Sequence, residues 1–248
     1  MDFANKVAIV TGGGTGMGKA ISLQLAAAGA SVVVNYSRSA DEATATVKEI
    51  EAAGGTAAAI QADVSDAAQV EALVSQTVER FGRLDAVVNN AGTTVFVPFK
   101  DLAGIDEGAW DRIIGVNVKA PWLMAKAAER ALRANGGGAI VNISSVAGLK
   151  PGGSSLAYSV SKAAMIHLTK CLALAMSPEV RVNSIAPGFV NTRWHDNSSD
   201  ERKRQIAEGS PLGRNVGVDE IASATLEALR NDNMTGQVIA IDSGTLLS

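Results

Sequence analysis

The stretch from residue 7 to residue 28 constrains the fold of this chain most strongly. Val7 to Val10 is an apolar, β-branched run that is too short for a helix, so it predicts a buried strand. A turn with glycines at 12, 16 and 18 follows, and a helical stretch then runs to Ala28. This order of elements can cradle a phosphate group, because glycines allow close backbone approach and the free N–H groups of the helix bind the anion. The spacing is GxxxGxG, which differs from the commoner GxGxxG of dinucleotide-binding turns.

Short apolar runs alternate with helical stretches along the rest of the chain. Six further strands are expected at Ser31–Val34, Ala57–Gln61, Ala86–Asn89, Ala139–Ile143, Arg181–Ile185 and Gln237–Asp242. Helices are expected over residues 40–53, 66–81, 106–134, 156–176 and 218–230, with a bend near Pro121. Such alternation predicts an α/β fold with an open parallel sheet. No repeat or linker divides the sequence, so we expect residues 1–248 to form one domain.

Composition narrows the class of protein. Hydrophobic residues make up 47% and charged residues 19%, which is typical of a globular chain and not of a disordered one. The net charge of −3 argues against a nucleic-acid partner. Cys171 is the single cysteine and there are two histidines, so we expect no disulfide, no metal site and no metal-dependent alcohol dehydrogenase. Neither a secretion signal nor a membrane span is evident, and we expect a cytoplasmic protein without a membrane partner.

The residues after the second expected strand bear on the choice of nucleotide. In dinucleotide-binding folds an acidic residue there binds the ribose of NAD, whereas an arginine accommodates the 2′-phosphate of NADP. No acidic residue occurs between Ser31 and Ala40, and Arg38 is present. The sequence therefore favours NADP over NAD. Further on, Asp63 could bind an adenine amino group or the backbone of its own loop.

Tyr158 and Lys162 are the strongest candidates for catalysis. Residues four apart lie on the same face of a helix, so both side chains can point into one site. A lysine beside a tyrosine favours the phenolate, and we expect the pKa of Tyr158 to fall towards the range of a general acid or base. The alternative is that Tyr158 packs and Lys162 extends to solvent.

Two polar residues are candidates for the same site. Ser145 follows the strand at 139–143, and the carboxyl ends of parallel strands are where sites form, so it is expected beside the cofactor. Asn117 interrupts a long helix, where an asparagine is unfavourable unless it contacts backbone or has a function. Either serine of the pair at 144 and 145 could instead only cap a loop.

Two further segments bear on assembly and substrate access. The helix at 156–176 is apolar on all sides, which predicts burial on both faces and packing against a second subunit. Residues 189–214 are polar and charged, and such a long loop in a compact domain is often a substrate lid.

From about Lys6 to the C-terminus the chain resembles the short-chain dehydrogenase/reductases. The motifs that carry the resemblance are Thr11-Gly12-xxx-Gly16-x-Gly18, Asn89-Asn90-Ala91-Gly92, Asn117, Ser145, Tyr158-xxx-Lys162 and Pro187-Gly188. The resemblance implies a Rossmann-type, doubly wound, seven-stranded parallel sheet with helices on both faces. It also implies a homotetramer formed through the helices that carry Asn117 and Tyr158.

The resemblance implies roles for individual residues. Tyr158 would be the general acid/base, Lys162 would bind the nicotinamide ribose and lower the pKa of Tyr158, Ser145 would hydrogen-bond the substrate oxygen, and Asn117 would hold a water in a proton relay. The expected cofactor site comprises Gly12, Thr15, Gly16, Met17, Gly18, Tyr36, Ser37, Arg38, Ser39, Asp63, Val64, Asn90, Ala91, Gly92, Tyr158, Lys162, Pro187, Gly188, Val190 and Thr192.

The implied activity is NADP(H)-dependent hydride transfer between the nicotinamide and a small-molecule ketone or secondary alcohol. Within the family the resemblance spans 3-oxoacyl-(acyl-carrier-protein) reductases and sugar or polyol dehydrogenases such as glucose dehydrogenase. The segment at 95–108 is longer and richer in glycine than is usual, which weakens analogies about substrate size. A cofactor-binding regulatory protein is the alternative from another class, because fold does not fix function.

Overall fold

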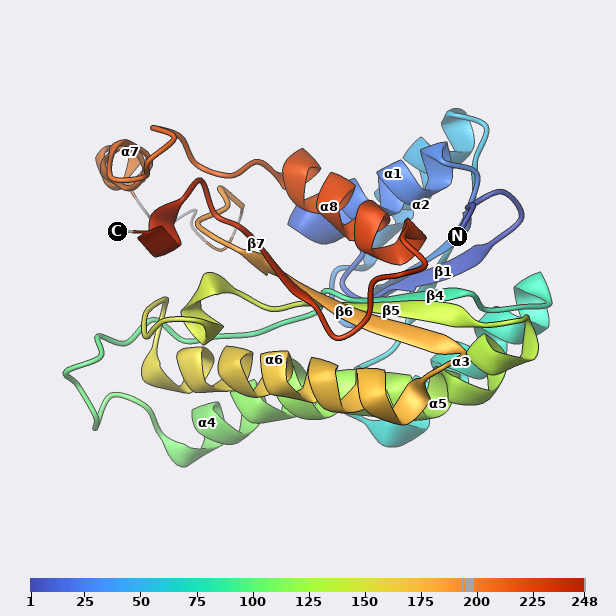
Figure 1. The fold of residues 1–248 in the computed structure, drawn as a ribbon, viewed down its shortest axis with the longest axis horizontal. Coiled ribbons are helices and arrows are strands. Elements are labelled where there is room, and N and C mark those ends of the chain that lie inside the picture. The colour runs from blue at the N-terminus through green and yellow to red at the C-terminus, as the bar shows by residue number, and fades with distance from the viewer. Residues whose placement is uncertain (193, 195–198, 248) are drawn as a thin grey trace.

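The computed structural model describes residues 1–192, 194 and 199–247. At its centre lies one sheet of seven strands in the order β3-β2-β1-β4-β5-β6-β7, and every neighbouring pair is parallel (Figure 1). The strands are β1 (Val7–Val10), β2 (Ser31–Tyr36), β3 (Thr56–Gln61), β4 (Ala86–Asn89), β5 (Gly138–Ile143), β6 (Val180–Pro187) and β7 (Val238–Ile241). The predicted α/β fold with a doubly wound parallel sheet is confirmed.

Helices cover both faces of the sheet. They are α1 (Gly16–Ala27), α2 (Ala40–Ala52), α3 (Ala67–Phe81), α4 (Glu107–Ile114), α5 (Ala120–Ala134), α6 (Leu156–Met176), α7 (Asp200–Glu208) and α8 (Val218–Arg230). In Figure 1, α1, α2 and α8 lie above the sheet, whereas α3, α5 and α6 lie below it. Each layer closes its own hydrophobic core against one face of the strands. Among the described residues, no helix has both the length and the apolar character needed to cross a bilayer.

The strand order places the functional loops together. β1 lies between β2 and β4, so the chain winds outwards from β1 to one edge of the sheet and then from β4 to the other. At such a switch point the loops that follow the two central strands diverge and leave a crevice. The loops after β1, β4, β5 and β6 all start from the carboxyl edge beside this crevice.

A buried polar chain fixes the central strands just below that edge. Asn89 of β4 donates to Asn142 of β5 over 2.8 Å, and Asn142 in turn donates to Thr169 of α6 over 2.9 Å. The Ser184 hydroxyl of β6 donates to the backbone carbonyl of Asn142 over 3.0 Å. Because Asn89, Asn142, Thr169 and Ser184 are fully or almost fully buried, a shifted register would leave these groups unpaired at a cost of about 1–3 kcal/mol each.

The helix expected over residues 106–134 is interrupted before Pro121, not bent at it. α4 ends at Ile114, the five residues Gly115–Lys119 form a π-helical turn, and α5 then begins at Ala120. Pro121 falls in the first turn of α5, where its missing N–H costs little. The wider turn contains Asn117, whose contacts are described below.

The predicted loop at 189–214 contains a helix, so that prediction is wrong for its second half. Ser199 caps α7 by accepting a hydrogen bond from the Arg202 backbone N–H, and Glu201 pairs with Arg204 three residues later. None of the nine residues of α7 is buried, so no apolar stripe marks it in the sequence. Local capping and charge pairing stabilise it instead. Residues 193 and 195–198 of this segment lie outside the described residues.

Candidate active site

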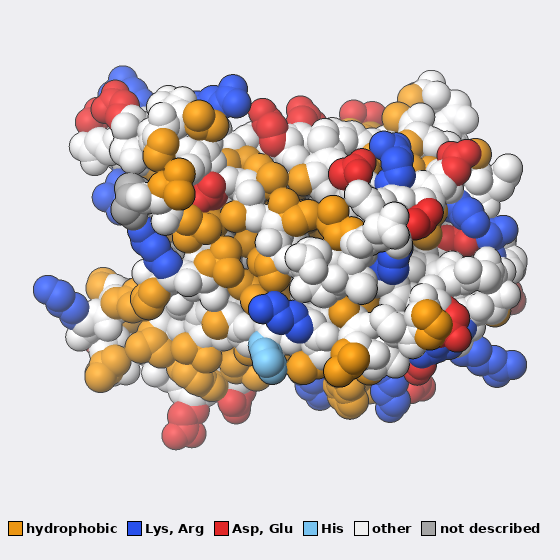
Figure 2. Space-filling model, in the orientation of Figure 1, with side chains coloured by type: hydrophobic (Ala, Val, Ile, Leu, Met, Phe, Trp, Pro, Cys, Tyr) orange, Lys and Arg blue, Asp and Glu red, His pale blue; other side chains and the backbone are white. Residues whose placement is uncertain are grey.

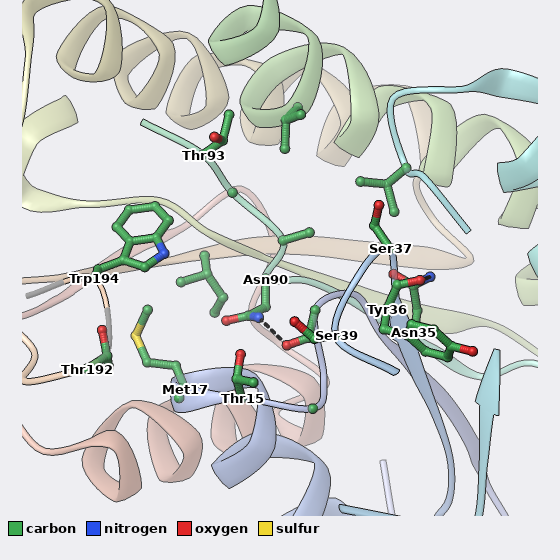
Figure 3. Close-up of a pocket in the computed structure, with 18 of the residues that line it drawn as sticks. Thr15, Met17, Asn35, Tyr36, Ser37, Ser39, Asn90, Thr93, Thr192 and Trp194 are labelled. Carbon is green, nitrogen blue, oxygen red and sulfur yellow. Dashed lines mark hydrogen bonds between the residues drawn. The ribbon is translucent and has the colours of Figure 1, made fainter. Parts of the chain in front are cut away.

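A cavity of about 500 Å³ opens at the carboxyl edge of the sheet. Figure 3 shows Asn35, Tyr36 and Ser37 at one end of it and Thr192 and Trp194 at the other. Its wall contains the predicted residues Gly12, Thr15, Gly16, Met17, Tyr36, Ser37, Arg38, Ser39, Asp63, Val64, Asn90, Ala91, Gly92, Ser145, Tyr158, Lys162, Pro187, Gly188, Val190 and Thr192. Two predicted site residues, Gly18 and Asn117, are not part of the wall.

The glycine turn between β1 and α1 fits a phosphate group. Gly12 and Gly16 have φ angles of 61° and 51°, in the left-handed region that favours glycine. Gly18 has a different role, because a Cβ there would lie 2.2 Å from the Gly12 carbonyl oxygen. It lets α1 pack against the turn. The first turn of α1 contains no acidic residue, and Gly16 and Met17 of this turn line the cavity, so the positive end of the helix dipole lies at the cavity.

The loop after β4 closes the other side of this turn. The Asn90 side chain donates to the carbonyl oxygens of Thr11 and Gly12 over 2.9 and 3.2 Å. The Thr11 hydroxyl accepts from the backbone N–H groups of Asn90 and Ala91 over 3.0 Å each. The motif Asn89-Asn90-Ala91-Gly92 therefore holds the ends of β1 and β4 in a fixed relation along the cavity.

The far end of the cavity is lined by Tyr36, Ser37, Arg38 and Ser39, none of them acidic. Arg38 is exposed at this end. Asp63 lines the cavity too, and its carboxylate accepts from the backbone N–H and the hydroxyl of Ser65 over 2.9 and 2.7 Å. Of the two roles considered for Asp63, the structure shows the bonding within its own loop.

Tyr158 and Lys162 lie on α6, one helical turn apart, and both line the cavity. α6 begins at Leu156 because the Ser155 hydroxyl caps it, accepting from the Tyr158 N–H over 3.2 Å. Lys162 is 3% exposed, its ammonium donates to the Ile143 carbonyl over 2.8 Å, and it lies 5.6 Å from the centre of the Tyr158 ring. Lys162 therefore does not extend to solvent.

The expected fall in the pKa of Tyr158 is not observed. Burial raises the pKa of the phenol to about 12, although a hydrogen bond with Ser145 acts in the opposite direction. Burial also lowers the pKa of Lys162 to about 7, so near neutral pH this side chain is only partly charged and favours the phenolate weakly. The desolvation of Tyr158, which raises its pKa, therefore outweighs the attraction of the Lys162 charge, which would lower it. The phenol is consequently protonated at neutral pH and is available as a proton donor.

Asn117 lies behind the cavity wall and is fully buried. Its amide accepts from the Thr93 N–H over 2.9 Å, donates to the Thr93 carbonyl over 3.0 Å and donates to the Ser161 hydroxyl over 2.9 Å. Ser161 in turn donates to the Tyr158 carbonyl over 2.7 Å. The side chain of Asn117 thus joins the loop after β4 to the helix that carries Tyr158.

The cavity wall also contains residues that sequence reasoning missed: Gly14, Asn35, Ala62, Ser65, Thr93, Arg112, Val116, Ile143, Ser144 and Trp194. Most of them are adjacent in the chain to predicted residues, and this adjacency is the feature from which they could have been predicted. Arg112 lies one helical turn before Val116, a spacing that could have indicated a shared face. Trp194 lies two residues after Thr192, within a segment whose composition predicted only a loop.

Comparison with known proteins agrees with this geometry. The family model described as short chain dehydrogenase matches residues 6–203. The chain belongs to the short-chain dehydrogenase/reductase family. It is therefore an oxidoreductase that acts on CH–OH or C=O groups, and its family uses NAD(P)H.

Relatives in this family match along nearly the whole chain. The 3-oxoacyl-(acyl-carrier-protein) reductase FabG of Staphylococcus aureus is 40% identical over 246 residues, which are 96% of this chain and 97% of that protein. The corresponding reductase of a Synechocystis species is 38% identical over 247 residues, 98% and 97% of the two chains. A short-chain dehydrogenase/reductase structure from Mycobacterium ulcerans has a TM-score of 0.92 at 32% identity and covers 100% of this chain and 92% of its own.

Proposed function

We propose that this chain is an NADPH-dependent reductase of 3-oxoacyl thioesters, which converts the 3-oxo group into a secondary alcohol. The observation that carries the proposal is the placement of Tyr158 and Lys162 one turn apart on α6, in a cavity that Ser145 also lines and whose glycine turn fits a dinucleotide phosphate. Burial keeps the phenol protonated at neutral pH, and this is the form that donates a proton to the nascent alkoxide in reduction.

Each of the four predicted catalytic residues has its own role in this reduction. NADPH, when bound, supplies the hydride to the carbonyl carbon. Ser145 and Tyr158 hydrogen-bond the carbonyl oxygen and polarise it, and Tyr158 transfers its proton to that oxygen. Lys162 would hold the ribose of the bound nucleotide and would return a proton to Tyr158, and Asn117 would hold the water of a proton relay.

The preference for NADPH over NADH rests on the far end of the cavity. Arg38 is exposed there among Tyr36, Ser37 and Ser39, and none of these residues offers a carboxylate to a ribose 2′-hydroxyl. A guanidinium binds a phosphate through charge-assisted, two-point hydrogen bonds. This end therefore suits the 2′-phosphate of NADPH.

The surroundings of the substrate end favour an acyl chain over a sugar. Thr93 lines the cavity. The segment that follows it contacts the loop before α6, because the Val97 N–H donates to the Ser154 carbonyl over 2.9 Å. Beside this contact, Phe96 and Phe99 are 62% and 37% exposed. Figure 2 shows hydrophobic side chains gathered over this end of the molecule. The names of the relatives, which are 3-oxoacyl reductases, support the same substrate class.

The test is to follow NADPH absorbance with acetoacetyl thioesters, diketones and sugars. We expect turnover of the thioester, and Tyr158→Phe should lower kcat by about 10²- to 10⁴-fold while NADPH still binds. Full turnover by Tyr158→Phe would contradict the assignment. Turnover of sugars alone would favour the polyol dehydrogenases, and tight NADPH binding without turnover of any compound would favour a regulatory protein.

The proposal extends to a cytoplasmic homotetramer assembled through α5 and α6. In the single chain Trp122 of α5 is 45% exposed, and Val160 and Leu174 of α6 are 44% and 83% exposed. Large apolar side chains left in solvent on both helices support packing against further copies.

A further inference from the structure

Trp194 stands between the catalytic tyrosine and the loop after β4. Its ring meets the Tyr158 ring edge-on, with the ring centres 5.9 Å apart and the planes at 69°. On its other side the indole approaches Gly92 in the loop after β4, where an added Cβ would lie 3.5 Å from the Trp194 Cη2 atom. Figure 3 shows the indole at the same end of the cavity as Thr93 and Thr192. Trp194 therefore forms part of the wall at the place where a substrate must approach Tyr158.

The chemistry of the site limits where the substrate can lie. The carbonyl oxygen has to reach the hydroxyl groups of Tyr158 and Ser145, at hydrogen-bond distances of about 2.6–3.2 Å. A ketone has two substituents on the carbonyl carbon, and both must find room around the Tyr158 ring. The indole occupies one side of that ring, so the substituent directed to this side has little space.

We propose that Trp194 is a specificity-determining residue that restricts the size of one substituent on the carbonyl carbon. This inference rests on the proposed reduction of ketones but goes beyond it, because it assigns the size limit to one side chain. A rigid indole packed against a second aromatic ring is suited to this role, since such ring pairs hold a preferred geometry. With 38% of its surface exposed, Trp194 is not a residue of the hydrophobic core.

The test compares two 3-oxo esters that differ only in the terminal substituent, ethyl 3-oxobutanoate with a methyl group and ethyl 3-oxo-3-phenylpropanoate with a phenyl group. The wild type should prefer the methyl ketone. Trp194→Ala should shift the ratio of kcat/KM values towards the phenyl ketone by about tenfold or more, and Trp194→Phe should shift it less. Trp110→Ala, in an exposed tryptophan of α4 outside the cavity wall, should leave the ratio unchanged. An unchanged ratio in Trp194→Ala, or an equal shift in Trp110→Ala, would overturn the inference.

A second measurement needs occupancy of the site but no turnover. In the double variant Trp110→Phe/Trp122→Phe, Trp194 is the single tryptophan, because the chain has three. NADP⁺ together with ethyl 3-oxobutanoate should lower the quenching of its fluorescence by acrylamide severalfold, since the ketone covers the indole. Unchanged quenching would overturn the role of Trp194 even if the wild type reduces ketones. If the wild type reduces neither these esters nor acetoacetyl thioesters but quenching falls, the proposed function fails and the placement of Trp194 at the ligand stands.

Discussion

At the scale of single residues, Arg38 offers the sharpest test of cofactor choice. Arg38→Ser should raise the KM for NADPH by about 10- to 100-fold, because a charge-assisted hydrogen bond contributes about 1.5–3 kcal/mol. The KM for NADH should hardly change, since NADH lacks the 2′-phosphate. Steady-state kinetics with both nucleotides measure the effect.

The matched control is Arg112→Ser, which removes the other exposed arginine that the described residues contribute to the cavity wall. Arg112 lies on α4 and not beside Tyr36 and Ser37, so its loss should not change the ratio of the two KM values. Equal losses with NADPH and NADH in Arg38→Ser would show that Arg38 does not recognise the 2′-phosphate.

The identity of the residues that line the cavity was easier to predict from the sequence than their pKa values and contacts. Spacing and chain order indicated Tyr158, Lys162 and Ser145, because i,i+4 neighbours share a helix face and strand ends share a sheet edge. The direction of the pKa shift of Tyr158 depends on desolvation by distant parts of the chain, which no local pattern shows. The contacts of Asn117 with Thr93 and Ser161 likewise arise only in the folded chain.

At the scale of elements, Asp85 joins β1 to the start of β4 at the edge opposite the active site. Its fully buried carboxylate accepts from the Val7 N–H over 2.9 Å and pairs with Lys6 and Arg83 over 3.3 and 2.6 Å. Burial alone would raise the pKa of Asp85, but the interactions with Arg83, Val7 and Lys6 outweigh it and lower the pKa below the 3.8 that is usual for an aspartate. The ionised carboxylate therefore stabilises the contact between the two strands.

Asp85→Asn should lower the free energy of unfolding by about 2 kcal/mol at pH 7, the size of a hydrogen bond to a charged group. Because the folded-state pKa is lowered, the wild type holds this contribution fully above the unfolded pKa near 3.8 and loses it as the pH falls through the folded value. Urea unfolding at pH 7 and in steps below pH 4 measures the difference between the two proteins.

Asp111→Asn, in an exposed carboxylate of α4, should leave the urea midpoint unchanged over the same pH range. A deficit of Asp85→Asn that stays constant down to the lowest pH would show that the charge of Asp85 is not what stabilises the strands. An increase of the deficit on acidification would contradict the direction of the pKa shift.

The elements that sequence reasoning found and missed differ in what stabilises them. Strands such as β1 are apolar along their length because both faces are covered, and this composition is visible in the sequence. α7 contains no buried residue and owes its helix to the Ser199 cap and the Glu201–Arg204 pair, so apolar periodicity could not reveal it. The π-helical turn at Gly115–Lys119 coincides with the bonds from Asn117 to Thr93, a tertiary contact that local propensity does not encode.

At the scale of the whole molecule, one strip of α6 remains without cover in the single chain. Its members follow a helical spacing: Val160, Ala163, His167, Cys171 and Leu174 are exposed, while the opposite side packs on the sheet. The sequence predicted that α6 is covered on both faces. The single chain covers one of them, and the proposed tetramer would cover the other.

Leu174→Asp should therefore shift the protein from tetramers to smaller species in light scattering or sedimentation. Leu174 is 83% exposed in the single chain, and burying a leucine contributes about 1.5–3 kcal/mol. In a two-fold interface each substitution acts twice, so the loss for each contact is about 3–6 kcal/mol, a rise of at least about a hundredfold in Kd. Leu212→Asp, in an apolar residue 64% exposed outside both helices, is the control and should leave the mass unchanged. If Leu174→Asp remained tetrameric, or the wild type had the mass of a single chain, α6 would not form the proposed interface, and its apolar strip would need another partner.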